Sequence, residues 1–524
     1  MLEQDKIIFT DTASLSETAG IRHRATESYL RSALQKRFPG ENFARIHVQE
    51  NTTGRYQHPA KWLEKIFGGG VPISGLPDYI EVEILHKTGD YAEMLIVWSP
   101  VAWNDRFAGT AGGGTSIGGR GYLTRPKNTQ RGWTVPFAIM NGFSAATMYA
   151  GNVEGFHDYI MNNRTGTFSR ELYENWRLRS THNMTVFGKA VTEILHDRPV
   201  KYSYMNGGSG GGRQSLMEVQ NYPEHYDGVW ASCPAIHWNH FLLGGFWAKA
   251  VMQDRHHFIG PGKTRFFMEQ VWNSVGGRNA YFHKQTPTPF DARTCIGMKS
   301  PNGILTIEDA EVMNEIWNGP HRTNGEFLWY GFYPGVKNWQ NIIPVATYYY
   351  PLFSCHEVRE AILSRYHARW ITGNPKQNFR QMSIADLEAL YDESQCKFKD
   401  ANGDDPAIDR FADHGGKLLL DHGMDDPLIP TEGTIAYYKS LLDHFGSADA
   451  VNRFCRMYIT PGDSHGNCWE NGPGITESDG MKALMAWVEQ NNAPQAIRTV
   501  QVSNKDGSMI EESSQMPWKA PLSE

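Results

Sequence analysis

The sequence lacks any apolar run that approaches the ~18 residues needed for a membrane-spanning helix. It also lacks an excess of basic residues, because 50 Lys and Arg stand against 57 Asp and Glu, which gives a net charge of −7. This balance supplies no electrostatic attraction to nucleic acid or to an anionic membrane surface. We therefore expect a globular protein whose partner is neither a membrane nor a nucleic acid.

Cysteine is also sparse. The six cysteines are scattered and form no Cys-x-x-Cys pair, so the sequence indicates neither a zinc site nor a disulfide framework. The first residues, MLEQDKIIFTDTASLSETAG, have neither the basic start nor the apolar core of a secretory signal peptide. Together these absences predict a cytoplasmic protein that uses no metal or other cofactor.

Strand-like and helix-like segments alternate on both sides of one long irregular stretch. YIEVEIL and VKYSYMN precede this stretch, while KLLLDHG, TEGTIAYYKSLLDHF and FCRMYIT follow it. The alternation predicts an α/β fold, a mostly parallel sheet with helices on both faces, interrupted by a cap. We expect an N-terminal extension over residues 1–75, a core built from 76–235 and 406–524, and a large inserted lid domain over 236–405. The lid segment is rich in aromatic residues and shows no clear strand–helix rhythm.

Three shorter segments give local predictions. One helix is expected from Glu17 to Lys36. The segment AGTAGGGTSIGGRG, residues 108–121, is too rich in glycine for a helix or strand and is expected to form a loop. PFAIMNGFSAATMYA, residues 136–150, suggests a buried strand.

A single serine, Ser209, lies among glycines in the stretch MNGGSGGGRQSLMEV, between a predicted strand and a predicted helix. The order strand, G-x-S-x-G, helix is that of a nucleophile turn, in which glycine removes collisions with the neighbouring strand and helix. The hydroxyl would project from the carboxyl edge of the sheet, with the N–H of Gly210 placed to stabilise an oxyanion. A glycine-rich linker is the alternative, whereas a phosphate-binding loop would need the missing Gly-Lys-Ser/Thr.

A serine nucleophile needs a base and an acid that orients the base, in the order Ser, acid, His in this fold class. The loop after KLLLDHG offers Asp425 and Asp426, which we prefer to Asp421 because Asp421 still belongs to the strand end. The loop after the last predicted strand offers His465. A surface-loop histidine without a catalytic role is its alternative, and His422 is a rival that lies very close in sequence to the acid.

A second oxyanion donor should come from an early loop. Ala111-Gly112-Gly113-Gly114 follows a predicted strand and is similar to the glycine-rich donor loops of esterases. Glycine lets the main chain approach a substrate carbonyl closely, so we expect Gly113 to donate its N–H and Gly114 to contact substrate. The alternative is a mobile surface loop.

These pieces together resemble the tannase and feruloyl esterase family of α/β hydrolases. The resemblance runs from about Leu76 to Trp487 and implies an α/β-hydrolase core with a large lid inserted before the acid. It implies Asp426 as the acid, His465 as the base, and hydrolysis of carboxylic esters, typically of aromatic acids. The matching stretches are LPDYIEVE, WNDRFAGTAGGG, GGSGGGRQSLMEVQNYPEHYDGVWASCPA, ILTIEDAEVMNEIWNGP, GGKLLLDHGMDDPLIPTEGTIAYYKSL and PGDSHG.

Two features depart from the family pattern. The family usually has a cysteine directly before the serine and another directly after the histidine, joined as a disulfide, but this sequence has Gly208 and Gly466 there. Loss of both halves fits a reducing compartment and should loosen the coupling between the two loops. The family's lid commonly binds calcium through an Asp-rich segment, whereas the corresponding span here has one acid, Asp291, so we expect no structural calcium.

The lid is expected to set substrate choice through its aromatic residues. Trp238 and Trp329 are candidates for contact with a bulky apolar or aromatic group, although most lid aromatics are expected to form the core of the lid. Arg213 could bind a carboxylate, and its alternative is an arginine that anchors the helix to the sheet.

The combined prediction is a serine hydrolase that cleaves a small-molecule carboxylic ester through a Ser-His-Asp triad and an acyl-enzyme. An acyltransferase or a C–C bond hydrolase of secondary metabolism would use the same triad. A catalytically inactive binding protein that kept the hydrolase fold is the alternative of a different class. A homodimer is compatible with the sequence.

Overall fold

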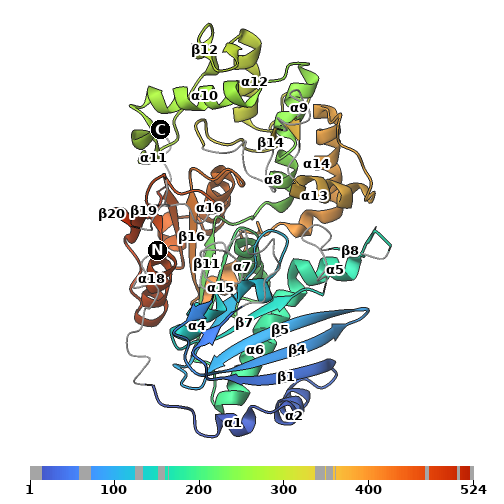
Figure 1. Ribbon diagram of the computed structural model, residues 1–524, viewed down its shortest axis with the longest axis vertical. Helices are drawn as coiled ribbons and strands as arrows, with labels where there is room; N and C mark the ends of the chain where they lie inside the picture. The colour runs from blue at the N-terminus through green and yellow to red at the C-terminus, as the bar shows by residue number, and fades with distance from the viewer. Residues whose placement is uncertain are drawn as a thin grey trace.

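The computed structural model describes residues 15–57, 72–123, 134–151, 160–162, 165–336, 348–349, 358–359, 362–465, 471–503 and 508–519. Its centre is a nine-stranded sheet in the order β1-β4-β5-β7-β6-β10-β11-β16-β17 (Figure 1). From β7 to β17 neighbouring strands are parallel, while β1, β4, β5 and β7 form an antiparallel edge. These strands are β1 Phe43–Asn51, β4 Tyr79–Thr88, β5 Tyr91–Pro100, β6 Arg106–Thr110, β7 Ser144–Tyr149, β10 Tyr202–Gly208, β11 Gly228–Ser232, β16 Lys417–Gly423 and β17 Cys455–Thr460.

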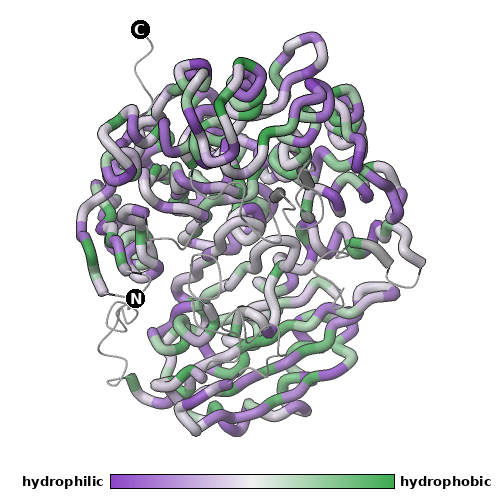
Figure 2. The backbone as a smooth tube through the Cα atoms, turned by 45° about the horizontal axis from the view of Figure 1, so that its top comes forward, coloured by the Kyte–Doolittle hydropathy of each residue, from purple (hydrophilic) through white to green (hydrophobic). Residues whose placement is uncertain are grey.

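Many residues of the sheet strands are hydrophobic (Figure 2), and they are buried on both faces of the sheet. Leu418 and Leu420 of β16 belong to one buried cluster and Leu419 to a second cluster on the other face. Successive strand residues point to opposite faces, so a strand buried on both sides needs a continuous apolar run. The sequence KLLLDHG meets that requirement, and the predicted mostly parallel α/β sheet is confirmed.

Helices cover both faces of the sheet. Apolar residues of α6, α7 and α16 join the first cluster, and those of α4 and α18 join the second. Gly188 lets α6 pack closely against the sheet, because a β-carbon at this position would lie 2.9 Å from Ala146 of β7 and from Phe107 of β6. The bounds are α4 Val135–Met140, α6 Ser180–His196, α7 Gly210–Asn221, α16 Thr431–Phe445 and α18 Glu477–Gln490.

Between β11 and β16 the chain forms a group of helices that lies at the opposite end of the molecule from β1 and α2 (Figure 1). We call the described residues 238–401 of this segment the insert. Capping boxes at Thr306 and Ser383 begin two of its helices, α12 and α14. Its helices are α8 Trp238–Gly244, α9 Trp247–Asp254, α10 Pro261–Ser274, α11 Arg278–Phe282, η6 Ala292–Cys295, α12 Ile307–Asn318, α13 Ile362–Thr372, α14 Ile384–Phe398 and η7 Lys399–Ala401.

Both ends of the chain add strands that the sequence did not predict. β1, which falls in the predicted extension 1–75, pairs antiparallel with β4 and places Val48 opposite Val82. Near the C-terminus, β18, β19 and β20 form a separate three-stranded sheet. The remaining elements are α1 Ile21–Arg24, α2 Glu27–Arg37, β2 Arg55–Tyr56, β3 Ile73–Ser74, η3 Arg120–Tyr122, β8 Met161–Asn162, β9 Thr167–Phe168, α5 Arg170–Glu174, the π-helix η5 Asn175–Arg179, β12 Lys299–Ser300, β13 Gly303–Ile304, β14 Tyr348–Tyr349, β15 Val358–Arg359, α15 Asp409–Asp413, α17 Ala448–Asn452, β18 Gly474–Ile475, β19 Ile497–Val502 and β20 Met509–Gln515.

Three local predictions differ from the structure. The single helix expected from residue 17 to 36 is two helices, because Thr26 takes an extended conformation and caps α2 by accepting a hydrogen bond from the N–H of Tyr29. The glycine-rich segment 108–121 begins inside β6. The stretch 136–150 is half helix and half strand, with Gly142 at φ 77° in the turn between α4 and β7.

Within the described ranges, no helix combines the length and apolarity that crossing a membrane demands.

A buried histidine ties the antiparallel edge of the sheet together. His86 of β4, 3% exposed, contacts Glu93 of β5 (Nδ1 to Oε2, 3.2 Å) and Glu41 before β1 (Nε2 to Oε2, 2.7 Å). Burial acts to lower the pKa of His86, but the two carboxylates outweigh burial and raise it above its ordinary value. Charged His86 therefore stabilises the fold.

We expect replacement of His86 by Gln to destabilise the protein most at low pH. Because the pKa is raised on folding, the contribution of the charge is complete below the unfolded value of about 6.5 and is lost as pH rises through the folded value. Urea unfolding should show a loss of about 1–3 kcal/mol near pH 5.5 that shrinks toward pH 8. His47→Gln is the matched control, since His47 is half exposed and faces Glu27, and it should change stability by less than about 0.5 kcal/mol. An equal loss for His86→Gln at both pH values would contradict the charge assignment.

Candidate active site

Ser209 lies at the sharp turn between β10 and α7. Its backbone has φ 59° and ψ −122°, a region that non-glycine residues rarely occupy and that carries strain. The flanking glycines permit the turn, because a β-carbon on Gly207 would lie 2.6 Å from the carbonyl oxygen of Gly211. The predicted strand–turn–helix is present, with Ser209 as the residue directly before the first turn of α7.

The glycine loop after β6 contacts this turn backbone to backbone. A β-carbon on Gly210 would lie 2.2 Å from the carbonyl oxygen of Gly114, and one on Gly211 would lie 2.1 Å from that of Gly112. The structure thus brings Gly210 and the loop that contains buried Gly113 together beside Ser209. Backbone N–H groups at a helix N-terminus favour negative charge.

Gln214 of α7 holds this loop in place and was not singled out from the sequence. Its Oε1 accepts a hydrogen bond from the N–H of Gly112 (3.4 Å), and its Nε2 donates to the carbonyl oxygen of Ser116 (3.1 Å). Gln214 belongs to the Gly-Arg-Gln that follows the serine turn. This position close to Ser209 was the feature of the sequence that could have pointed to its role.

Asp426 and His465 form a buried pair. Nδ1 of His465 lies 2.7 Å from Oδ2 of Asp426, and the two residues are 9% and 1% exposed. The other oxygen of Asp426 accepts hydrogen bonds from the N–H groups of Leu428 (2.8 Å) and Ile429 (3.0 Å). A carboxylate only accepts, so Nδ1 carries the proton and Nε2 of His465 presents a lone pair.

The two other candidate acids have different contacts. Oδ1 of Asp421 accepts a hydrogen bond from the indole of Trp230 (2.7 Å), and Oδ2 of Asp425 accepts one from Asn471 (2.6 Å). Of the three carboxylates, Asp426 is the one that bonds to His465.

His422, which we considered as a rival base, is a second histidine on the same acid. Its Nε2 lies 2.9 Å from Oδ2 of Asp426, its Nδ1 lies 2.8 Å from the hydroxyl of Thr434 in α16, and its side chain is fully buried. Oδ2 of Asp426 therefore accepts from two imidazoles at once. His422 is placed to orient Asp426 rather than to contact a substrate.

These contacts keep Asp426 ionised. Burial acts to raise its pKa, but the imidazole of His465 and the hydrogen bonds from both histidines outweigh burial and hold the pKa well below its ordinary value. The carboxylate is consequently charged at any pH near neutrality, and it can stabilise an imidazolium at His465.

Nε2 of His465 is buried and makes no hydrogen bond within the described residues, so it is not bonded to the hydroxyl of Ser209 in this structure. The chain nevertheless gathers the two residues at one edge of the sheet. The N–H of Ser209 donates to the carbonyl oxygen of Ser232 at the end of β11, and the next residue, Cys233, places its thiol within 4.8 Å of ligand atoms of His465 and Asp426. Cys233 was not singled out from the sequence.

The insert supports the loop that carries His465. A β-carbon on Gly462 would lie 2.7 Å from the carbonyl oxygen of Phe282 in α11, so the two backbones are in contact. Nη2 of Arg278 in the same helix donates to Oδ1 of Asn471 on the far side of the loop (2.6 Å). The histidine loop is thus held from the insert side.

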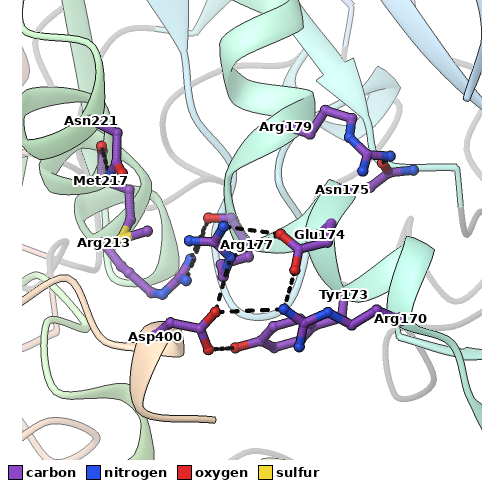
Figure 3. A network of polar contacts seen from close by, with 10 residues as sticks. All are labelled: Arg170, Tyr173, Glu174, Asn175, Arg177, Arg179, Arg213, Met217, Asn221 and Asp400. Carbon is purple, nitrogen blue, oxygen red and sulfur yellow. Dashed lines mark hydrogen bonds and ion pairs between the residues drawn. The ribbon is translucent and has the colours of Figure 1, made fainter.

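Arg213 lies four residues after the serine, is itself buried, and belongs to a network of polar contacts (Figure 3). Its Nε donates to the carbonyl oxygen of Ala401, and its guanidinium lies 4.1 Å from the ring of Trp176 in η5. Next to Ala401, Asp400 pairs with Arg177 of η5 (3.4 Å). These contacts tie α7 to η5 and η7 and match the anchoring alternative, although the arginine anchors the helix to these elements rather than to the sheet.

The two tryptophans named from the sequence differ in their surroundings. Trp238 is 1% exposed and packs beside Trp176, with ring centroids 5.0 Å apart, inside the core. Trp329 is 7% exposed, contacts the rings of His237 and His240, and lies 3.0 Å from where a β-carbon of Gly433 would be. Gly433 precedes Thr434 in α16, and the hydroxyl of Thr434 contacts His422, so Trp329 packs against the helix that contacts His422.

Three positions from the predicted departures remain to be placed. Gly208 ends β10, whereas Gly466 lies outside the described residues. Asp291 caps η6 by accepting a hydrogen bond from the N–H of Arg293 (3.0 Å), and it also accepts one from Asn314 (2.7 Å). The single acid of this segment is therefore used in local hydrogen bonds.

Comparison with known proteins places these observations in a family. Residues 92–520 match the model of the family described as tannase and feruloyl esterase. A probable feruloyl esterase of Arthroderma benhamiae is 30% identical over 438 residues, which cover 80% of this chain and 77% of that protein.

Solved structures share the fold. The tannin acyl hydrolase of Aspergillus niger superposes with a TM-score of 0.77 at 19% identity, covering 96% of this chain and 93% of the other. Feruloyl esterase B of Aspergillus oryzae gives a TM-score of 0.73 at 18% identity, with coverages of 93% and 96%. The chain belongs to the tannase and feruloyl esterase family, and it is a carboxylic ester hydrolase.

Proposed function

We propose that Ser209, His465 and Asp426 hydrolyse a carboxylic ester through an acyl-enzyme. Nε2 of His465 takes the proton of the Ser209 hydroxyl while the oxygen bonds to the ester carbonyl carbon. The imidazolium returns this proton to the departing alcohol as the C–O bond breaks. Water then attacks the acyl-enzyme with His465 again as base, which releases the acid and restores the serine.

The oxyanion of each tetrahedral intermediate would accept hydrogen bonds from the N–H groups of Gly210 and Gly113. Support comes from the backbone contact between the turn and the glycine loop, which holds the two segments in a fixed relation without side chains between them. Each such donor contributes about 10²–10³ in rate because it is oriented before the charge develops.

The observation that carries the proposal is the buried His465–Asp426 pair. Its Nδ1–Oδ2 bond fixes the imidazole with its lone pair on Nε2, and that buried atom has no partner among the described residues. A buried acceptor without a hydrogen bond is costly, and bonding to Ser209 or to a substrate-bound water would relieve the cost. The gap to the serine closes when substrate orders the site, as is common for catalytic hydrogen bonds.

We propose an ester of an aromatic acid as the substrate. The relatives named above are a probable feruloyl esterase and a tannin acyl hydrolase, and the buried Trp329 packs beside α16, whose Thr434 contacts His422. Aromatic side chains favour flat apolar groups through offset or edge contacts. A panel of feruloyl and aliphatic esters of the same alcohol should show higher kcat/KM for the feruloyl members.

Replacement of Ser209 by Ala should abolish both covalent labelling by a fluorophosphonate and ester hydrolysis, because the atom that forms the acyl bond is removed. The loss in kcat should be about 10⁴-fold or more. Ser215→Ala in the same helix α7 is the matched control and should keep both properties. Labelling that persists in the Ser209 variant would assign the nucleophile elsewhere.

Replacement of His422 by Leu should lower kcat by roughly 10- to 100-fold with little change in KM, because a hydrogen bond to a buried charge is lost without loss of a substrate contact. His422→Gln should recover part of this loss, since its amide can donate to Asp426. His444→Gln controls for histidine replacement at the exposed end of α16. Equal kcat for the Leu variant and the unmodified protein would remove the orienting role.

A further inference from the structure

The loop that carries His465 begins and ends against helix α11 of the insert. Its two stems touch each other, because a β-carbon on Gly462 would lie 2.4 Å from the α-carbon of Gly472. A β-carbon on Gly462 or on Gly472 would also lie 2.7 or 2.8 Å from the carbonyl oxygen of Phe282 in α11. Glycine at both stems therefore permits contact between backbones, and α11 lies at the base of the histidine loop.

Beside these stems, Asn471 joins the insert to the loop that carries the acid. Nη2 of Arg278 in α11 donates to Oδ1 of Asn471 (2.6 Å), and Nδ2 of Asn471 donates to Oδ2 of Asp425 (2.6 Å). Asn471 and Asp425 are 7% and 1% exposed. Both hydrogen bonds involve a charged group, and such bonds are stronger than those between neutral groups. We call Arg278, Asn471 and Asp425 the Asn471 link.

The link ends one residue before Asp426, the proposed acid. The N–H of Asp425 donates to the carbonyl oxygen of Asp463 in the histidine loop (3.1 Å). Helix α11 also lies near this carboxylate, because burial and then the charge of Asp425 raise the pKa of Tyr281 above its ordinary value. The hydroxyl of Tyr281 donates to the carbonyl oxygen of Pro334 (2.6 Å), which holds α11 to another segment of the insert.

The position of His465 is the property that this link can control. Nε2 of His465 makes no hydrogen bond within the described residues, so its approach to Ser209 depends on where the histidine loop lies. We infer that Arg278 and Asn471 are positioning residues, which act through the loop to keep His465 within reach of Ser209. This inference rests on the proposed function, in which His465 is the base. A misplacement of about 1 Å can cost about 100-fold in rate.

Kinetics of variants test the positioning role. Arg278→Ala and Asn471→Ala should each lower kcat for ester hydrolysis about 10- to 100-fold and leave KM within about twofold. Because both changes break the same link, the double variant should lose about as much as one single variant. Arg278→Lys should recover part of the loss, since its ammonium group can still donate. Asn279→Ala changes an exposed neighbour in α11 and should keep kcat. Losses that multiply in the double variant, or that appear in KM alone, would overturn the inference.

Hydrogen exchange tests the link without catalysis. In the full-length protein without substrate, Arg278→Ala should speed amide exchange in the histidine and acid loops, including Asp425, at least about 10-fold. Exchange in β16 should stay the same, and Asn279→Ala should match the unmodified protein. Unchanged loop exchange in Arg278→Ala overturns the inference. If the unmodified protein hydrolyses no ester, the proposed function fails, and the exchange rates still decide whether the link holds the loop.

Discussion

The buried carboxylate of Asp426 is the group on which the arrangement of the site depends. A charge removed from water is tolerated only when hydrogen bonds replace its hydration. Its four donors are two N–H groups of its own loop and the imidazoles of His422 and His465. These donors come from the end of β16, from the loop that follows β16 and from the loop after β17. The hydrogen bonds to one charge therefore fix three segments relative to one another. Thr434 extends the connection to α16.

The serine half of the site is held by contacts of another kind. Its strained turn is supported by glycine backbones that touch at distances no β-carbon would allow, and by the hydrogen bond from the N–H of Ser209 to Ser232. Such a turn persists only where its surroundings determine it fully. Gln214 and Arg213 of α7 provide that support, one by bonding the glycine loop and the other by anchoring the helix to η5 and η7.

Much of the site could be predicted because the ends of parallel strands meet at one edge, so residues after β10, β16 and β17 had to gather there. The sequence predicted the strands that are buried on both faces, because such strands are continuous apolar runs. β1 was not predicted, because it is an edge strand and most of its exposed positions carry polar residues. The sequence also could not show that His422 shares Asp426 with His465, since this depends on the direction in which a buried side chain points. The caps that begin α12 and α14 were present in the sequence, but the apolar pattern of the insert gave no clear period.

The insert contacts the loop that carries His465, apart from the role in substrate choice that the sequence predicts. The family resemblance implies a disulfide between the serine and histidine loops, but the sequence here has glycine at both positions, Gly208 and Gly466. In its place, α11 touches the histidine loop at Gly462, and Arg278 reaches Asn471, which in turn donates to Asp425 beside the acid. Contacts of this kind are weaker than a covalent bond and depend on the position of α11. The orientation of His465 is consequently linked to the packing of the insert, so a shift of α11 would also move the proposed base.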